Sequence, residues 1–166
     1  YWINKTNNIE TPIEYGYCGG WKAFLNSDDL LLVAIIAVCI CLAPIFAGEY
    51  QAKTDSIVLT SKYGKTKLVS AKIVAAFIFG SLAFLLHVLL ALGIQLTVAG
   101  TDGANLQIQI TNIISPYKLT LISATLLAIL IDFLVLWTMI GLTLFISAKL
   151  KSTFLTLIID VLILLI

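Results

Sequence analysis

The stretch LLLVAIIAVCICLAPIFAG, residues 30–48, decides the fold of this chain because it contains no charged side chain over 19 residues. A helix of about 20 apolar residues is long enough to cross the hydrocarbon core of a bilayer. Pro44 lies near one end of the stretch and is expected to kink the helix there, since proline lacks a backbone N–H. The segment therefore predicts a membrane-spanning helix.

Three further apolar runs follow the first. Residues 73–100 contain one ionisable group, His87, and residues 119–148 contain one acid, Asp132. A fourth run starts near Thr153 and contains Asp160. The second and third runs exceed a minimal span, so we expect them to tilt or to extend beyond the lipid.

Composition agrees with a lipid environment. The 166 residues are 60% hydrophobic and 11% charged, with a mean hydropathy of +1.06, whereas soluble domains have about a quarter of their residues charged. We predict an all-α, polytopic transmembrane helical bundle, a fragment with about four spans of which the last is truncated. Its parts are an external segment at 1–28 and a transmembrane domain at 29–166.

The lysines predict the orientation of the spans. Residues 49–72 contain five lysines and residues 149–152 contain two, whereas Lys5, Lys22 and Lys118 are the only lysines of the other connections. Lysine-rich loops stay on the cytoplasmic side. We therefore expect 49–72 and 149–152 to be cytoplasmic, with 1–28 and the loop 101–116 outside a plasma membrane, in a bacterial cell.

Residues typical of catalysis are scattered along the chain. A single histidine cannot form a histidine cluster, and Cys39 and Cys41 point roughly 200° apart on a helix. Gly64, Lys65 and Thr66 resemble the end of a P-loop, but Leu59 occupies the position of its first glycine. We predict that the chain is not an enzyme, binds no metal and no cofactor, and has no nucleic-acid partner.

The lysine-rich connection shows helix signals of its own. Thr54 or Asp55 can cap a helix start, Ile57 and Leu59 supply a short apolar core, and Gly64 can end the helix in a left-handed conformation. We expect a short cytoplasmic helix here, attached to a membrane span at each end. A helix attached in this way can transmit movement from a soluble partner to both spans.

These residues resemble a known family. The stretch AGEYQAKTDSIVLTSKYGKTKLVSAKI, residues 47–73, is similar to the region after the second span in the permease subunits of type 2 ABC exporters. The shared features are an acid at the membrane exit, a turn containing threonine, a Leu-Thr-Ser-Lys run at 59–62, and a lysine that opens the next span. Tyr63-Gly64 departs from the turn with Pro or Arg that many members have.

The resemblance implies a coupling helix that docks on a separate ABC ATPase subunit. ATP and Mg²⁺ would then be bound by that subunit, and a second permease copy or homologue would complete a dimer in the membrane lipids. The residues expected to bind the ATPase are Glu49, Thr54, Asp55, Ile57, Leu59, Ser61, Lys62 and Lys65.

The ionisable residues inside the apolar runs suggest a second feature. A charge at the centre of a bilayer costs about 2.5–3.5 kcal/mol on insertion scales, so His87, Asp132 and Asp160 should face protein or water. His87 shares a helix face with small residues, and so does Asp132. The two lie at similar depth, and we predict that they hydrogen-bond directly or through water, either as a packing clamp or as a proton or ion relay.

Two other functions stay open at this point. An ion-coupled secondary transporter would use His87, Asp132 and Asp160 directly and would need no ATPase. A membrane scaffold or immunity protein would perform no transport.

Overall fold

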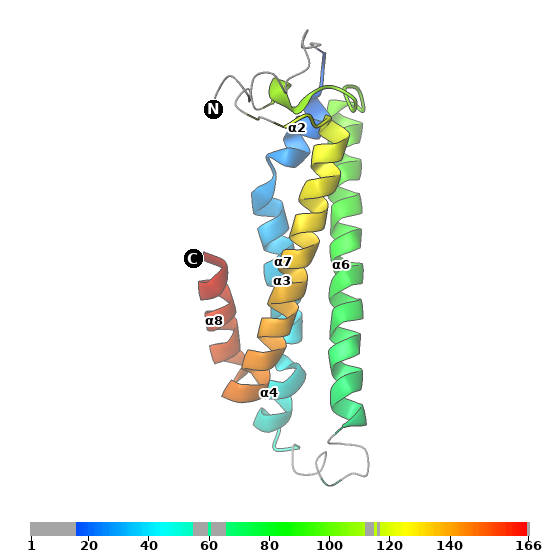
Figure 1. Ribbon diagram of the computed structural model, residues 1–166. Helices are drawn as coiled ribbons and strands as arrows, with labels where there is room; N and C mark the ends of the chain where they lie inside the picture. Colours follow the sequence, from blue (N-terminus) through cyan, green and yellow to red (C-terminus); the bar gives the residue numbers. More distant parts are fainter. Residues whose placement is uncertain (1–15, 55–59, 61–65, 112–114, 116, 166) are drawn as a thin grey trace. The chain divides into compact units, whose positions relative to one another are not determined.

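The computed structural model describes residues 16–54, 60, 66–111, 115 and 117–165. The helices in chain order are α2 (Gly19–Leu25), α3 (Asp28–Leu42), α4 (Pro44–Gln51), α6 (Lys67–Ala99), the 3₁₀ helix η1 (Ile108–Ile110), α7 (Leu121–Leu150) and α8 (Thr153–Leu165) (Figure 1). No strand occurs in the described residues. The predicted all-α fold is confirmed.

Three helical segments are long and apolar enough to cross a membrane: Leu32–Gln51, Lys67–Ala99 and Leu121–Leu150. They coincide with the first three predicted runs. Helix α6 begins at Lys67, six residues before the predicted run at 73–100, because its first turn is polar but helical: the Ser70 N–H donates to the Thr66 carbonyl. Side chains of α6 and α7 such as Leu82, Leu86 and Leu126 are more than 60% exposed, as lipid-facing residues are.

Pro44 divides the first span into two helices. Helix α3 ends at Leu42, Ala43 follows as a single intervening residue, and Pro44 occupies the first turn of α4. Proline is suited to this position because the first N–H groups of a helix have no partner within the helix. The predicted kink is therefore present as a break between helices.

The chain forms two compact units, residues 1–28 with 88–131 and residues 29–87 with 132–166. In the second unit, α3, α6 and α7 meet at Gly80, whose missing side chain leaves room for Val38 and Ile140. A Cβ atom at Gly80 would lie 2.5 Å from Ile140 Cδ1 and 3.3 Å from Val38 Cγ1. Glycine thus permits close packing of these helices.

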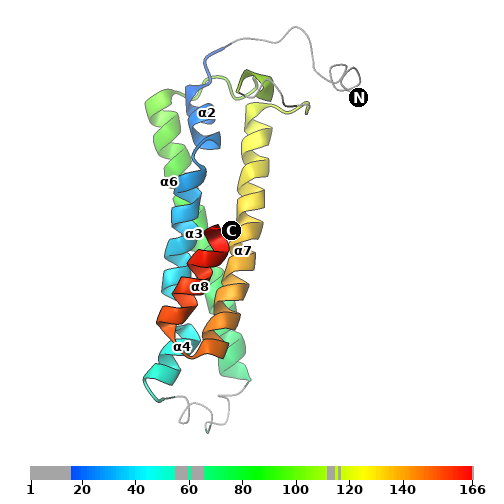
Figure 2. The ribbon, with the colours of Figure 1, turned by 90° about the vertical axis from the view of Figure 1, so that its left-hand side faces the viewer.

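Aromatic rings extend the contact of α6 with α7 in the second unit. The rings of Phe77 and Trp137 meet edge to face at 5.6 Å between centroids, and Phe84 lies 5.8 Å from Phe133. The indole N–H of Trp137 donates to Ser81 Oγ at 3.1 Å, so its polar atom is satisfied. Helix α8 lies beside α7 (Figure 2), and Thr143 of α7 is within hydrogen-bond distance of Asp160 on α8 and of Cys39 on α3.

In the first unit, the connection after α6 folds back on the start of α7. Residues Gln107 and Thr120 form an isolated antiparallel bridge, and the Ile108 N–H donates to the Leu119 carbonyl at 2.9 Å. Helix α2 contacts the same connection, because Trp21 Nε1 donates to the Thr101 carbonyl at 3.1 Å. The predicted loop at 101–116 is therefore ordered by backbone pairing in its described part.

Candidate functional site

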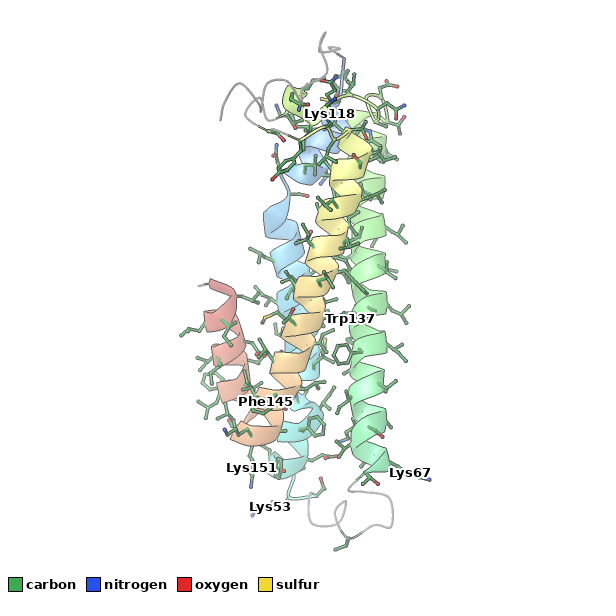
Figure 3. The ribbon with its side chains drawn as sticks, viewed as in Figure 1. Lys53, Lys67, Lys118, Trp137, Phe145 and Lys151 are labelled. Atoms are coloured by element: carbon green, nitrogen blue, oxygen red, sulfur yellow. The ribbon has the colours of Figure 1, made fainter. Side chains whose placement is uncertain are left out.

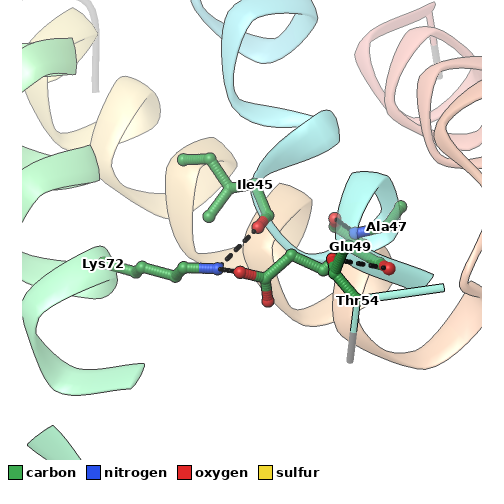
Figure 4. Close-up of polar contacts among 6 residues, drawn as sticks. Ile45, Ala47, Glu49, Thr54 and Lys72 are labelled. Carbon is green, nitrogen blue, oxygen red and sulfur yellow. Dashed lines mark hydrogen bonds and ion pairs between the residues drawn. The ribbon is translucent and has the colours of Figure 1, made fainter. Parts of the chain in front are cut away.

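The residues that flank the lysine-rich connection form a polar cluster in the second unit. Lys72, in the second turn of α6, makes an ion pair with Glu49 near the end of α4, and its Nζ also donates to the Ile45 carbonyl at 3.1 Å (Figure 4). The Phe46 ring lies 5.3 Å from the same ammonium group. The two side chains of the ion pair are 21% and 30% exposed, so water screens them only in part. The pair joins the helix that enters the connection to the helix that leaves it.

The end of α4 is closed by its own backbone. Lys53 has a φ of 55°, and the N–H groups of Lys53 and Thr54 donate to the carbonyls of Tyr50 and Glu49, each at 3.1 Å. This pattern is the Schellman motif, in which two last carbonyls of a helix gain partners. The Thr54 hydroxyl adds a bond of 3.3 Å to the Glu49 carbonyl. Glu49 is therefore held through its side chain and its backbone.

Ser147 of α7 hydrogen-bonds to the backbone on both sides of Pro44. Ser147 Oγ donates to the Ala43 carbonyl at 2.6 Å and accepts the Ala47 N–H at 3.0 Å. In a regular helix, the Ala47 N–H would bond directly to the Ala43 carbonyl. The Ser147 hydroxyl takes a place between these two groups, which is a known cause of helix bending. It links α4 to α7 through buried hydrogen bonds.

Helix α8 joins the same end of the second unit. Thr153, its first residue, donates to Gln51 Oε1 at 3.0 Å, and the Lys151 ammonium lies 4.8 Å from the centre of the Tyr50 ring. Figure 3 shows Lys53, Lys67 and Lys151 near this end of the unit. The described lysines of the two predicted cytoplasmic connections thus gather where α4, α6, α7 and α8 begin or end.

Two of the eight residues predicted to bind an ATPase, Glu49 and Thr54, are described, and the structure brings them into contact. The remaining six lie outside the described residues: Asp55, Ile57, Leu59, Ser61, Lys62 and Lys65. The predicted short helix between residues 54 and 64 stays a prediction. Sequence reasoning did not find Ser147, which lies outside the lysine-rich stretch at 49–72, or Gln51, which lies within that stretch but was not among the eight residues predicted to bind the ATPase.

The three ionisable residues of the apolar runs lie in the second unit. His87 on α6 and Asp132 on α7 are half-buried, and the predicted hydrogen bond between them stays a prediction. His87 Nε2 is buried without a hydrogen-bond partner in the described part of the chain. Asp160 on α8 is 1% exposed, so its carboxyl group does not face lipid.

Asp160 belongs to a buried polar row that the sequence did not reveal. Its Oδ2 lies 3.0 Å from Thr143 Oγ1 on α7, which lies 3.5 Å from Cys39 Sγ on α3. Thr143 and Ser147 are four residues apart, as are Thr156 and Asp160, and all four are at most 1% exposed. This spacing places each pair on one helix face, which was the available signal for a polar contact of α7 with α8.

The first unit contains a small pocket of about 150 Å³, lined by Gln107, Gln109, Lys118, Leu119 and Thr120. Gln109 is 4% exposed and its Nε2 donates to the carbonyls of Tyr117 at 2.9 Å and Ser115 at 3.3 Å. The Gln109 amide thus fixes the backbone of the residues that lead into α7. Its hydrogen bonds give it a structural role in the pocket wall.

Comparisons of the chain with models of known families, with curated proteins and with solved structures give no match. The helices themselves define the class, a protein with several apolar helices suited to a membrane. The described residues include no group of three His, Cys, Asp or Glu side chains that could hold a metal ion. The polar cluster around Glu49 and Lys72 is suited to a mechanical role, because it fixes helices to one another.

Proposed function

We propose that this chain is the transmembrane permease subunit of an ATP-driven ABC exporter. The ion pair between Glu49 and Lys72 is the main observation in favour, because it joins the two helices that flank the stretch with the family resemblance. A partner ATPase would bind this stretch and would itself hold ATP and Mg²⁺. The lysine-rich connections would then face the cytoplasm of a bacterial cell.

Force applied to the connection would reach several helices at once in this proposal. The backbone hydrogen bonds of Lys53 and Thr54 fix the chain to the end of α4, directly before the proposed docking residues. Helix α4 is hydrogen-bonded to α7 through Ser147 and to α8 through Gln51. Movement of α4 would therefore shift these helices together, and alternating access would follow at an interface with a second permease copy.

Copurification tests the proposed partner. The chain is expressed with the ATPase encoded beside its gene, and the complex is purified in mild detergent. We expect Leu59→Asp to release the ATPase, because a charge replaces the apolar residue at the centre of the docking stretch. Tyr117→Asp is the matched control, since Tyr117 is 67% exposed and lies on the predicted outer side. Equal retention of the ATPase by both variants would contradict the proposal.

Thiol labelling tests the orientation. Thr60→Cys and Tyr117→Cys are made in a chain whose three natural cysteines are replaced by alanine, and a membrane-impermeant maleimide is added to intact cells. We expect labelling of the cysteine at 117 in intact cells and of the cysteine at 60 only after lysis. The opposite pattern would place the connection outside the cell, where no ATPase could reach it.

The buried carboxyl of Asp160 supports a second candidate, an ion-coupled secondary transporter that uses His87, Asp132 and Asp160. Its flux should collapse in Asp132→Asn and Asp160→Asn and should survive Leu59→Asp. The exporter requires that Leu59→Asp abolish ATP-dependent flux. A scaffold or immunity protein would show no flux that either kind of substitution alters.

A further inference from the structure

The carboxyl group of Asp160 has one oxygen with a partner and one without. Asp160 is 1% exposed on α8, and its Oδ2 lies 3.0 Å from the hydroxyl of Thr143, which is fully buried. Oδ1 is buried and has no hydrogen-bond partner in the described part of the chain. A buried polar atom without a partner costs about 1–3 kcal/mol, and more if it is charged. This carboxyl therefore lacks the contacts that would stabilise a negative charge.

The hydrogens of the polar row can be counted. Thr143 Oγ1 is within reach of both Asp160 Oδ2 and Cys39 Sγ, but a hydroxyl group has one hydrogen and can donate to only one of them. If Oδ2 holds a proton, Asp160 donates to Thr143, and Thr143 is free to donate to Cys39. If the carboxyl is ionised, Thr143 must donate to Asp160, and only the weak thiol donor of Cys39 can serve the second contact.

The surrounding charges do not compensate an ionised Asp160. Helices α3 and α8 contain no basic residue in the described chain, and the titratable group of α3 at this site is the Cys39 thiol. On α4, Glu49 is paired with Lys72; on α7, the Lys149 ammonium lies over the Phe145 ring. An uncompensated buried charge costs several kcal/mol.

A metal cation fits this site poorly. Hard cations such as Ca²⁺ take six to eight oxygen ligands. The atoms that the structure places at Asp160 are a hydroxyl oxygen and, beyond it, a thiol sulfur. A proton requires only one lone pair of the carboxyl group, so it fits where a metal ion does not.

From this geometry we infer that Asp160 is a proton-binding site, at which a neutral carboxylic acid holds α8 to α7 and α3 through Thr143 and Cys39. The bound proton makes the acid a donor to Thr143 and removes the charge from the helix interface. This inference does not rest on the proposed exporter function, since the state of the carboxyl can be measured without any transport.

Infrared spectroscopy of the full chain in lipid at pH 7 tests the inference. The C=O stretch of a neutral acid is separate from the bands of a carboxylate, and the difference between wild type and Asp160→Asn isolates this residue. We expect the difference to show the loss of one neutral-acid band. Asp102→Asn is the control, because Asp102 is exposed to solvent and its substitution should leave the neutral-acid band in place. Carboxylate bands in the Asp160→Asn difference would overturn the inference.

Two further measurements test the ligand and its partner. Exchange of potassium for sodium should leave the neutral-acid band unchanged; a weaker band in sodium would identify a metal-cation site and overturn the inference. Thr143→Val should shift the band to higher frequency, because the acid loses its acceptor. Thr138→Val is the control on the same helix, since its hydroxyl donates to the Leu134 carbonyl of α7 itself. A band that Thr143→Val does not shift would exclude the proposed hydrogen bond.

Discussion

Lys72 Nζ contacts two groups of the neighbouring helix at once, the carboxylate of Glu49 and the carbonyl oxygen of Ile45. The lysine thus neutralises an acid at the end of α4 and also provides a donor to a carbonyl within that helix. Both partners come from the segment after Pro44. Lys72 therefore fixes α6 to α4, the second part of the first span.

Removal of this ion pair should give a measurable coupling energy. We predict about 0.5–1 kcal/mol from a double-mutant cycle of Glu49→Gln and Lys72→Gln, because the pair is partly exposed and water weakens it. The measurement is the free energy of unfolding of the purified chain in detergent. Lys22→Gln, at an exposed site, should change it little. A coupling energy of zero would show that the ion pair does not hold the two helices together.

Ser147→Ala should destabilise the chain more than other serine substitutions. The Ala43 carbonyl and the Ala47 N–H both lose their buried partner, and we expect a cost of about 1–3 kcal/mol in the free energy of unfolding. Ser70→Ala is the control, because Ser70 is exposed and its hydroxyl donates to the Lys67 carbonyl of its own helix. Equal effects of the two substitutions would mean that the Ala47 N–H bonds directly to the Ala43 carbonyl when the serine hydroxyl is removed.

Gly80→Leu should separate α6 from α3 and α7. Its Cβ alone would lie 2.5 Å from Ile140 Cδ1, and the longer side chain would reach further into the same space. Overpacking of this kind costs about 1–3 kcal/mol, measurable as a lower midpoint of thermal unfolding. Gly141→Leu provides the comparison, since a Cβ there would meet no described atom within 4 Å beyond the local helix backbone and the neighbouring residues. The packing argument fails if both variants unfold at the same temperature.

Gly103→Ala should loosen the contact of α2 with the connection after α6. Gly103 has a φ of +84°, and a Cβ atom there would clash with the Tyr17 carbonyl oxygen. A left-handed conformation costs a residue with a Cβ about 1–2 kcal/mol, and the backbone clash adds to it. We expect faster amide hydrogen exchange in α2. Gly93→Ala, where a Cβ meets nothing within 4 Å, should leave that exchange unchanged.

Much of the candidate site could be located from the sequence, but its contacts could not. The acid at Glu49 and the lysine at Lys72 stand out because they border apolar runs, yet they are 23 residues apart and nothing in the spacing shows that they pair. Thr143 and Ser147 have polar side chains in an otherwise apolar helix. Their partners on α3, α4 and α8 depend on how the helices pack, which a periodic pattern does not specify.

The sequence by itself determined the helical class, the approximate limits of the long helices and the break at Pro44. These features depend on local chemistry: apolar runs of sufficient length, and a proline that lacks an N–H. Only the tertiary structure decided that the Ser147 hydroxyl occupies the gap between Ala43 and Ala47, and that Asp160 is buried against Thr143. The physical reason is that a polar group inside an apolar helix bundle must find its partner on another helix, and the packing of the helices selects that partner.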